Sequence, residues 1–263
     1  MDLGIKGRVA IVAAASKGLG RAVAEELARE GCEIAICART AADLERAAGE
    51  IERANGRKVL WRSVDVRNAG AIEDFVAAVE KQFGRVDICV TNSGGPPSKK
   101  FLETTSQEWQ SAVDDMLLST VTFARATLPL MQRNKWGRLI TITSISAKQP
   151  IDGLILSNAV RAGVMGLAKT LATEFGSSGI TVNNVCPGFT LTDRLAELAD
   201  KRAGDAGSTR DQVLSAMASQ IPAGRVAKPQ EFAAVVAFLA SERASFVSGT
   251  SIAVDGGMAK GLF

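Results

Sequence analysis

The sequence contains no histidine and no tyrosine. These are two of the side chains that enzymes most often use to give or take a proton. Any reaction that requires proton transfer must therefore use another side chain or water. This absence restricts the chemistry more than any other feature of the composition.

The chain also lacks a long apolar run and an apolar leader. The longest uninterrupted run, Phe232 to Ala240, is too short to span a bilayer, and Met1 is followed by Asp2 and Lys6. The net charge of +3 is too small and too dispersed to indicate a nucleic-acid surface. We therefore expect a cytoplasmic protein that binds neither membranes nor nucleic acids.

Cysteine is scarce, and its spacing excludes paired motifs. The four cysteines show no C-x-x-C spacing, and Cys32, Cys37 and Cys89 lie in or beside apolar, strand-like runs. We expect buried free thiols and no metal site.

What the sequence does contain is a regular alternation of strand-like and helix-like segments. A length of 263 residues with 46% apolar residues suits one large α/β domain. Strands are expected at 8–14, 33–38, 58–64, 85–90, 139–143, 180–186 and 251–254. Helices are expected at 41–54 and 109–131; three more begin near residues 16, 69 and 229, and a long one that carries Ser157 and Arg161 ends at residue 175. This order predicts a single-domain, Rossmann-type, doubly wound parallel sheet flanked by helices, spanning 1–263.

A glycine turn joins the first strand to the first helix. Glycine lets the backbone approach a pyrophosphate closely, and the first N–H groups of a helix favour negative charge. The residues expected to contact a cofactor here are Ala14, Ser16, Lys17, Gly18, Leu19 and Gly20. The alternative is that the glycines only allow the helix to pack tightly on the strand.

Arg39 ends the second strand, where a dinucleotide fold selects the adenosine ribose. A cation there suits a 2′-phosphate, and Lys17 adds a second one, so NADP(H) is favoured over NAD(H). The alternative is two solvated surface cations.

Two further strand ends carry candidate cofactor contacts. Asp65 and Val66 follow the third strand and are expected to bracket an adenine ring, although Asp65 could instead cap the helix near Ala69. After the fourth strand come Asn92, Ser93 and Gly94, where the glycine pair at 94–95 would let backbone lie against a ligand, or form a turn before the following prolines.

The run from Leu139 to Thr143 is β-branched and apolar and ends at Ser144, as expected of a central strand that delivers a polar side chain to the carboxyl edge of the sheet. On the next helix Ser157 and Arg161 stand four residues apart, so they project from one face. These three residues are the candidate catalytic group.

Two segments are expected to shape the substrate pocket. Residues 189–220 are polar, rich in alanine and bounded by glycine and proline, which is typical of a lid, although a surface insertion fits as well. The loop 96–101 ends near Lys99 and Lys100, which would meet an acidic carrier or simply face water.

Several motifs in order resemble the short-chain dehydrogenase/reductase family, and most of all its 3-oxoacyl-carrier-protein reductase branch. They are AAASKGLG at 13–20, Asp65-Val66, TNSGG at 91–95, Ser144, GITVNNVCPGFTLTDR, IPAGRVAKPQEFAAVVAFLAS and VSGTSIAVDGG. The resemblance covers nearly the whole chain. It implies hydride transfer between a nicotinamide cofactor and a carbonyl or alcohol, cofactor contacts at Pro187, Gly188, Thr190 and Thr192, and a homotetramer.

The resemblance also shows what this chain lacks. The family's catalytic serine matches Ser144, but its tyrosine falls at Ser157, its lysine at Arg161 and its asparagine at Met116, while Ala13 and Ala14 replace Thr-Gly in the phosphate turn. We hypothesise that Ser144 and Ser157 bond the substrate oxygen, Arg161 stabilises negative charge and the cofactor ribose, and water supplies the proton.

Alternatives remain open at this stage. Lys148 is a second candidate acid, or more simply a solvated loop lysine, and Cys186 could approach the nicotinamide or be a buried thiol. We favour an NADP(H)-dependent oxidoreductase acting on a small carbonyl or alcohol, either free or bound to a carrier. The rivals are a nucleotide-binding subunit or sensor and, last, a cofactor-independent lyase, since halohydrin dehalogenases also carry arginine at the lysine position.

Overall fold

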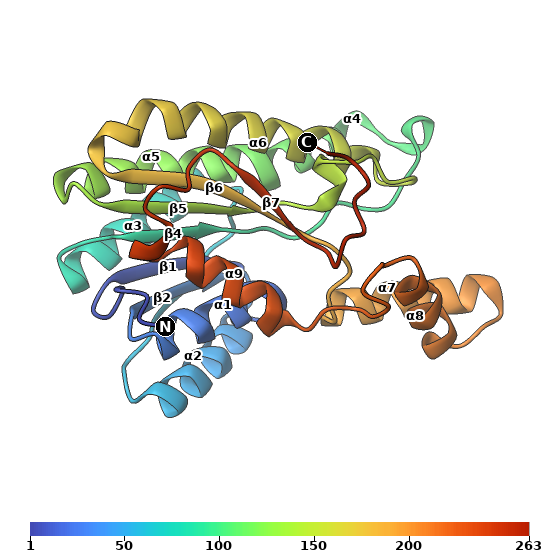
Figure 1. The fold of residues 1–263 in the computed structure, drawn as a ribbon, viewed down its shortest axis with the longest axis horizontal. Coiled ribbons are helices and arrows are strands. Elements are labelled where there is room, and N and C mark those ends of the chain that lie inside the picture. The colour runs from blue at the N-terminus through green and yellow to red at the C-terminus, as the bar shows by residue number, and fades with distance from the viewer. Residues whose placement is uncertain (263) are drawn as a thin grey trace.

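The computed structural model describes residues 1–262. Seven parallel strands form one sheet in the order β3-β2-β1-β4-β5-β6-β7 (Figure 1). The strands are β1 (Val9–Ala13), β2 (Glu33–Ala38), β3 (Leu60–Ser63), β4 (Ile88–Thr91), β5 (Gly137–Ile142), β6 (Ile180–Pro187) and β7 (Ser251–Val254). The order reverses between β1 and β4, which is where doubly wound sheets bind ligands.

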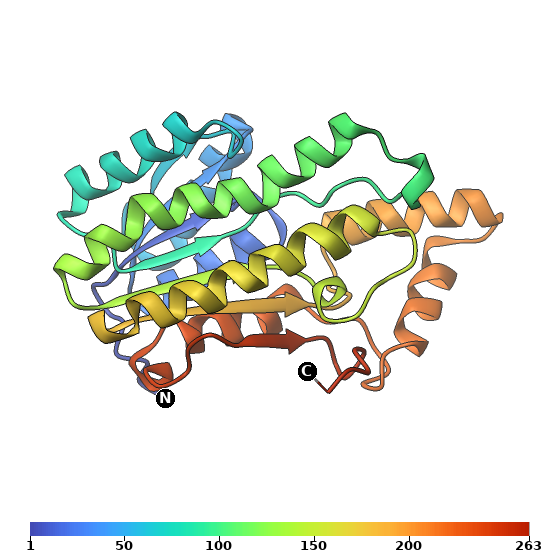
Figure 2. The ribbon, with the colours of Figure 1, turned by 90° about the horizontal axis from the view of Figure 1, so that it is seen from above.

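Helices cover both faces of the sheet and account for the continuous burial of its central strands (Figure 2). One face packs against α1 (Gly18–Arg29), α2 (Ala41–Asn55) and α9 (Pro229–Leu239). The other packs against α3 (Ala69–Phe83), α5 (Ser119–Arg133) and α6 (Ile155–Phe175). The predicted three-layer, single-domain α/β fold is therefore confirmed.

The helix predicted at 109–131 is longer and less regular than expected. It begins as α4 (Ser106–Ala112), widens into a π-helical segment η2 (Val113–Leu118) and continues as α5. Two hydroxyls at the end of η2 bond carbonyls one turn earlier: Ser119 Oγ donates to Asp115 O at 2.6 Å and Thr120 Oγ1 to Met116 O at 2.8 Å. A π-helical turn often accompanies a functional site, and this one carries Met116.

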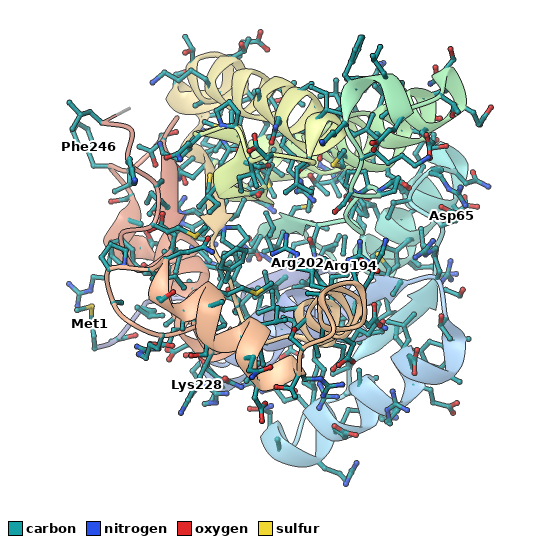
Figure 3. All side chains as sticks on the ribbon, turned by 90° about the vertical axis from the view of Figure 1, so that its right-hand side faces the viewer. Met1, Asp65, Arg194, Arg202, Lys228 and Phe246 are labelled. Carbon is teal, nitrogen blue, oxygen red and sulfur yellow. The ribbon has the colours of Figure 1, made fainter. Side chains whose placement is uncertain are left out.

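The segment predicted as a lid contains two helices, α7 (Asp193–Ala206) and α8 (Arg210–Ser219). They pack on each other as a helical hairpin beside the carboxyl ends of the strands (Figure 1). Figure 3, viewed from that end, shows the hairpin in front of the sheet, with Arg194 and Arg202 on α7. Short helices complete the chain: η1 (Phe101–Glu103), η3 (Ile145–Ala147), η4 (Gly176–Ser178) and η5 (Glu242–Ala244).

Two expectations from composition can be compared with the structure. All four cysteines are buried and unpaired, as predicted. Within residues 1–262, no helix is both long enough and apolar enough to cross a bilayer.

Candidate active site

The turn after β1 has the close backbone approach expected of a phosphate-binding loop. A methyl group on Gly20 would lie 2.4 Å from the backbone oxygen of Ala14, so only glycine fits at that position. Gly18 has a φ of +62° and begins α1, whose first N–H groups face the turn. Ala14 itself has a φ of +50°, a left-handed conformation that costs a residue with a Cβ about 1–2 kcal/mol.

Two exposed cations flank this turn. Lys17 precedes α1 and Arg39 follows β2, as predicted, and the Arg39 backbone oxygen accepts a bond from Ser63 Oγ at 2.7 Å. Their side chains extend into solvent at the edge of the sheet where an adenosine 2′-phosphate is expected.

Asp65 already has a partner in this structure. The guanidinium of Arg67 donates to both carboxylate oxygens of Asp65, and this bonding lowers the pKa of that carboxyl. Arg67 also lies 3.8 Å from Asp115, whose pKa burial raises. An adenine amine that bonds Asp65 must therefore share the carboxylate with Arg67 or displace it. The alternative role of Asp65 as a helix cap is wrong, because Asn68 accepts the bond from Ala71 N at the start of α3.

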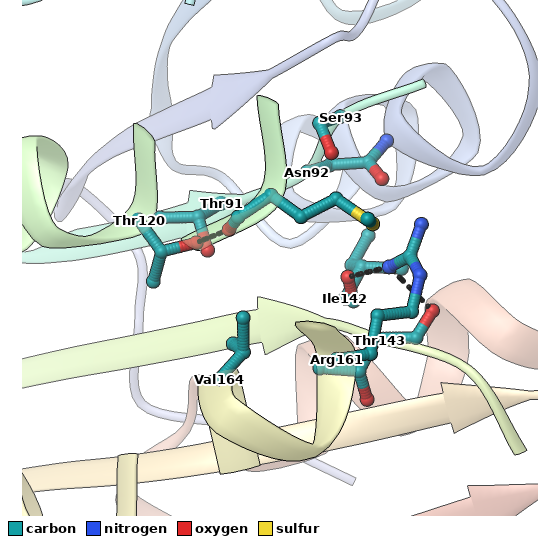
Figure 4. Close-up of a pocket in the computed structure, with 9 residues that line it drawn as sticks. Thr91, Asn92, Ser93, Thr120, Ile142, Thr143, Arg161 and Val164 are labelled. Atoms are coloured by element: carbon teal, nitrogen blue, oxygen red, sulfur yellow. Dashed lines mark hydrogen bonds between the residues drawn. The ribbon is translucent and has the colours of Figure 1, made fainter. Parts of the chain in front are cut away.

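A small cavity lies at the carboxyl edge between β4, β5, η2 and α6 (Figure 4). Its lining joins three predicted site residues, Asn92, Ser93 and Arg161, to Met116 at the position of the family asparagine. The other lining residues are Thr91, Thr120, Ile142, Thr143 and Val164. The strand ends therefore line the cavity mainly with polar side chains, whereas the helices contribute the apolar Met116 and Val164 together with the polar Thr120 and Arg161.

Arg161 is the only charged side chain in that lining, and it is 8% exposed. One of its terminal nitrogens donates to the backbone oxygens of Ile142 at 3.1 Å and Thr143 at 2.9 Å. No carboxylate pairs with it in the described part of the chain, and burial lowers its pKa to about 10. The group stays cationic at neutral pH, and a single terminal nitrogen makes both of the bonds to the strand end (Figure 4).

The two candidate serines are linked through a third. Ser144 Oγ accepts from the backbone N–H of Ser146 at 3.0 Å, and the Oγ atoms of Ser146 and Ser157 are 2.9 Å apart. Ser157 and Arg161 lie on one face of α6, as the spacing predicted, and both are buried. The structure thus brings Ser144, Ser157 and Arg161 to the same edge of the sheet.

Lys148 and Cys186 have structural partners. Lys148 is half-buried and donates to the Ser251 backbone oxygen at 3.1 Å, so it is not the solvated loop lysine that the sequence favoured. Cys186 is buried, its sulfur lies 3.1 Å from Thr143 Oγ1, and burial raises its pKa. Both residues support the loop that carries Ser144.

The chain after β6 approaches the phosphate turn. A methyl group on Gly188 would lie 2.7 Å from Asp255 Cβ, so glycine is needed at this position beside Pro187. Thr190 Oγ1 donates to Gly188 O at 3.3 Å, and Thr192 caps α7 and lies near Gly18. Of the predicted contacts from this segment, Thr192 is therefore the one that lies against the phosphate turn.

Comparison with known proteins agrees with this geometry. A family model described as enoyl-(acyl carrier protein) reductase matches residues 13–259. The chain belongs to the short-chain dehydrogenase/reductase family. It is 35% identical over 257 residues to the 3-oxoacyl-[acyl-carrier-protein] reductase FabG of Escherichia coli, covering 97% of this chain and 99% of that protein.

Solved structures of similar reductases match this chain over nearly its whole length. L-sorbose reductase from Gluconobacter frateurii, complexed with NADPH and L-sorbose, superposes with a TM-score of 0.96 at 35% identity and 100% coverage of both chains. The F189W actinorhodin polyketide ketoreductase with NADPH gives 0.92 at 30% identity, covering 97% of this chain and 98% of that one.

The residues present fit the dinucleotide that this family implies. Gly94 and Gly95 leave open space, because a methyl group on either would have no neighbour within 4 Å. The close turn at Gly20, the start of α1 and the exposed Arg39 and Lys17 supply the shape and charge for phosphates. These features fit a dinucleotide, and alanine at positions 13 and 14 leaves them in place.

Sequence reasoning missed two contributors to the site. Thr143 holds Arg161 through its backbone oxygen and lines the cavity, and Ser146 connects the two candidate serines. The serines at 144 and 146 are visible in the sequence, but the contact with Ser157 depends on the path of the loop between them.

Proposed function

We propose that this short-chain dehydrogenase/reductase reduces a carbonyl group, or oxidises the matching alcohol, with NADP(H). The observation that carries the proposal is the buried, unpaired cation of Arg161, which lines a cavity at the carboxyl ends of β4 and β5, next to the switch point of the sheet. A fixed positive charge in a desolvated site stabilises a developing alkoxide. The NADPH-bound relatives support the choice of cofactor.

The residues proposed to hold the cofactor lie around the switch point. The phosphates would meet the turn formed by Ala14, Ser16, Lys17, Gly18, Leu19 and Gly20, and the 2′-phosphate would meet Arg39. The remaining contacts are Asp65, Val66, Asn92, Ser93, Gly94, Arg161, Pro187, Gly188, Thr190 and Thr192. When bound, NADPH supplies the hydride.

Three side chains of this protein would act on the substrate oxygen. Ser144 and Ser157 donate hydrogen bonds to it, and Arg161 stabilises the charge that forms there. None of these groups is a strong proton donor at neutral pH, because a serine hydroxyl is a weak acid and Arg161 keeps its proton. Water supplies the proton after the charge has formed. Losing a positioned acid costs roughly 10²- to 10⁴-fold in rate, so we expect slow turnover.

The hairpin of α7 and α8 is proposed to act as the lid at 189–220. Its helices pack mainly on each other and stand beside the edge where the site opens (Figure 1). Thr192 at its base lies near Gly18 of the phosphate turn. Closure of this hairpin would cover the cofactor and select the substrate.

A carrier-bound substrate is a narrower version of the proposal. Of the two lysines beside the pocket loop, Lys99 pairs with Glu108 at 2.7 Å, so its charge is already balanced. Lys100 precedes η1, whose Phe101 and Leu102 are exposed. Lys100 is the residue of this loop that we expect to meet an acidic carrier.

We also propose a cytoplasmic homotetramer, as the family resemblance implies. β7 pairs only with β6 and is an edge strand of the sheet, and Phe246 before it is fully exposed (Figure 3). An exposed edge with an apolar side chain is a ready surface for a second copy. Four free thiols suit a reducing compartment.

Calorimetric titration with NADPH and with NADH tests the cofactor assignment. Arg39→Ala should weaken NADPH binding about 10- to 100-fold and leave NADH binding unchanged, because it removes charged bonds to the 2′-phosphate. The control is Arg53→Ala, which removes an exposed arginine of α2 and should change neither NADPH binding nor NADH binding. Failure of the wild-type protein to bind either nucleotide would refute the oxidoreductase assignment.

Turnover is tested by NADPH consumption with ethyl acetoacetate as a 3-oxoacyl probe and L-sorbose as a ketose probe. We expect slow oxidation of NADPH with at least one class of ketone. NADPH binding without turnover on a broad carbonyl panel would favour a nucleotide-binding subunit or sensor instead.

A further inference from the structure

Ser146 is buried at the junction of the two serines assigned to the substrate oxygen, with 2% of its surface exposed. Its backbone N–H bonds Ser144 Oγ at 3.0 Å, and its own Oγ lies 2.9 Å from Ser157 Oγ. One residue on η3 therefore contacts the hydroxyls of both serines.

The bond from the Ser146 N–H to Ser144 Oγ determines which further hydrogen bonds the Ser144 hydroxyl can form. A serine oxygen has one proton to donate and two lone pairs to accept with. Because the amide of Ser146 occupies a lone pair, the proton of Ser144 remains available to a ligand. Any residue except proline at position 146 would supply this amide, so the Ser146 side chain must be judged by its contact with Ser157.

The contact with Ser157 has two proton arrangements. If Ser157 donates, the proton of Ser146 is left in a buried position where the structure gives it no acceptor, which is costly. If Ser146 donates, the unbonded proton belongs to Ser157, which is 6% exposed and lies one turn before Arg161 on the same face of α6. Ser146 is the more deeply buried of the two, so donation from Ser146 leaves the unbonded proton on the less buried hydroxyl.

We propose that Ser146 is a positioning residue that orders these protons, so that Ser144 and Ser157 both present O–H donors to one substrate oxygen. This inference rests on the proposed function for the identity of that oxygen. The neighbouring residues of the same helix are apolar and buried, since Leu156 and Val160 pack with Met116 in one cluster. Low local polarity strengthens such a hydrogen-bond chain.

A double-mutant cycle tests whether Ser146 acts through Ser157. Ser146→Ala should lower kcat roughly three- to tenfold and leave the KM for NADPH unchanged, because it removes one ordering hydrogen bond. In a Ser157→Ala background, Ser146→Ala should have no further effect on kcat. Equal losses of kcat in both backgrounds would overturn the proposal. Ser241→Ala, a buried serine at the opposite edge of the sheet, is the control for general loss of stability.

Neutron diffraction of the deuterated wild-type protein gives a readout that does not require turnover. A deuteron on Ser146 Oγ directed at Ser157 Oγ supports the proposal. A deuteron on Ser157 Oγ directed at Ser146 Oγ overturns it. The position of the deuteron is measured without a substrate. Failure to find turnover would therefore count against the proposed function, whereas the diffraction result alone decides the role of Ser146.

Discussion

The guanidinium of Arg161 donates to the backbone oxygen of Thr143 at 2.9 Å, which ties the cation to the end of β5. The same nitrogen also bonds Ile142 O, so the rest of the planar group is left for the cavity. Arg161 therefore has two separable effects. It anchors helix α6 to the strand end, and it places a positive charge where the substrate oxygen is expected.

Replacing Arg161 with alanine should abolish turnover, because the lining of the cavity would lose its one positive charge. The two bonds to the strand end would also be lost, and we expect a decrease of about 1–3 kcal/mol in the free energy of unfolding. Steady-state kinetics and urea denaturation measure the two effects. A folded variant that keeps the wild-type rate would refute the role assigned to this cation.

Arg161→Lys separates charge from shape. An ammonium keeps the positive charge but cannot reproduce the planar fork that bonds the strand end and faces the cavity together. We expect turnover above that of the alanine variant and below that of the wild type. A rate equal to that of Arg161→Ala would show that geometry, and not charge, is what the site requires.

The pH dependence of turnover should lack an ionisation near neutrality. Burial lowers the pKa of Arg161 to about 10, below its usual value, so the charge is present from acid to neutral pH and is lost only as the pH rises through about 10. The cost of burying this charge is correspondingly relieved above that pH. We expect kcat to be level between pH 6 and pH 9 as far as this group is concerned, and to fall above it. A limb of the profile near pH 7 would indicate a different catalytic group.

The strained alanine of the phosphate turn offers a stability test. Ala14 has a φ of +50°, whereas glycine adopts this conformation without penalty. Ala14→Gly should raise the free energy of unfolding by about 1 kcal/mol, as measured by chemical denaturation. The adjacent Ala15 is buried and has no such conformation, so Ala15→Gly should lower stability instead. If both variants lose stability equally, the turn is not strained at Ala14.

The elements that follow a simple periodicity could be predicted from the sequence. β-branched runs gave all seven strands to within a few residues, and the spacing of Ser157 and Arg161 placed them on one helix face. These features depend on local pattern and on the burial of a parallel sheet. A single sequence is therefore enough to predict them.

The contacts that determine the chemistry of the site could not be predicted from local sequence pattern. Lys148 reaches Ser251 across 103 residues of sequence, and Ser146 reaches Ser157 across a loop, so both depend on how separate segments pack. The π-helical segment at Met116 likewise has no periodic signature, and Met116 packs there with Leu156 and Val160 of α6. Asp65 was assigned to adenine, yet the neighbouring Arg67 already bonds it.

Alanine at two glycines of the cofactor site should have different effects, on stability at Gly20 and on NADPH binding at Gly94. A methyl group on Gly20 would lie 2.4 Å from the Ala14 backbone oxygen, so Gly20→Ala should destabilise the protein by about 1–3 kcal/mol even without nucleotide. A methyl group on Gly94 has no neighbour within 4 Å, so Gly94→Ala should leave unfolding nearly unchanged. If the dinucleotide lies against this backbone, the same methyl group would meet it, and NADPH binding should weaken about tenfold. Denaturation and calorimetry of the two variants test this contrast. Unchanged NADPH affinity in Gly94→Ala would mean that the cofactor does not pass this strand end.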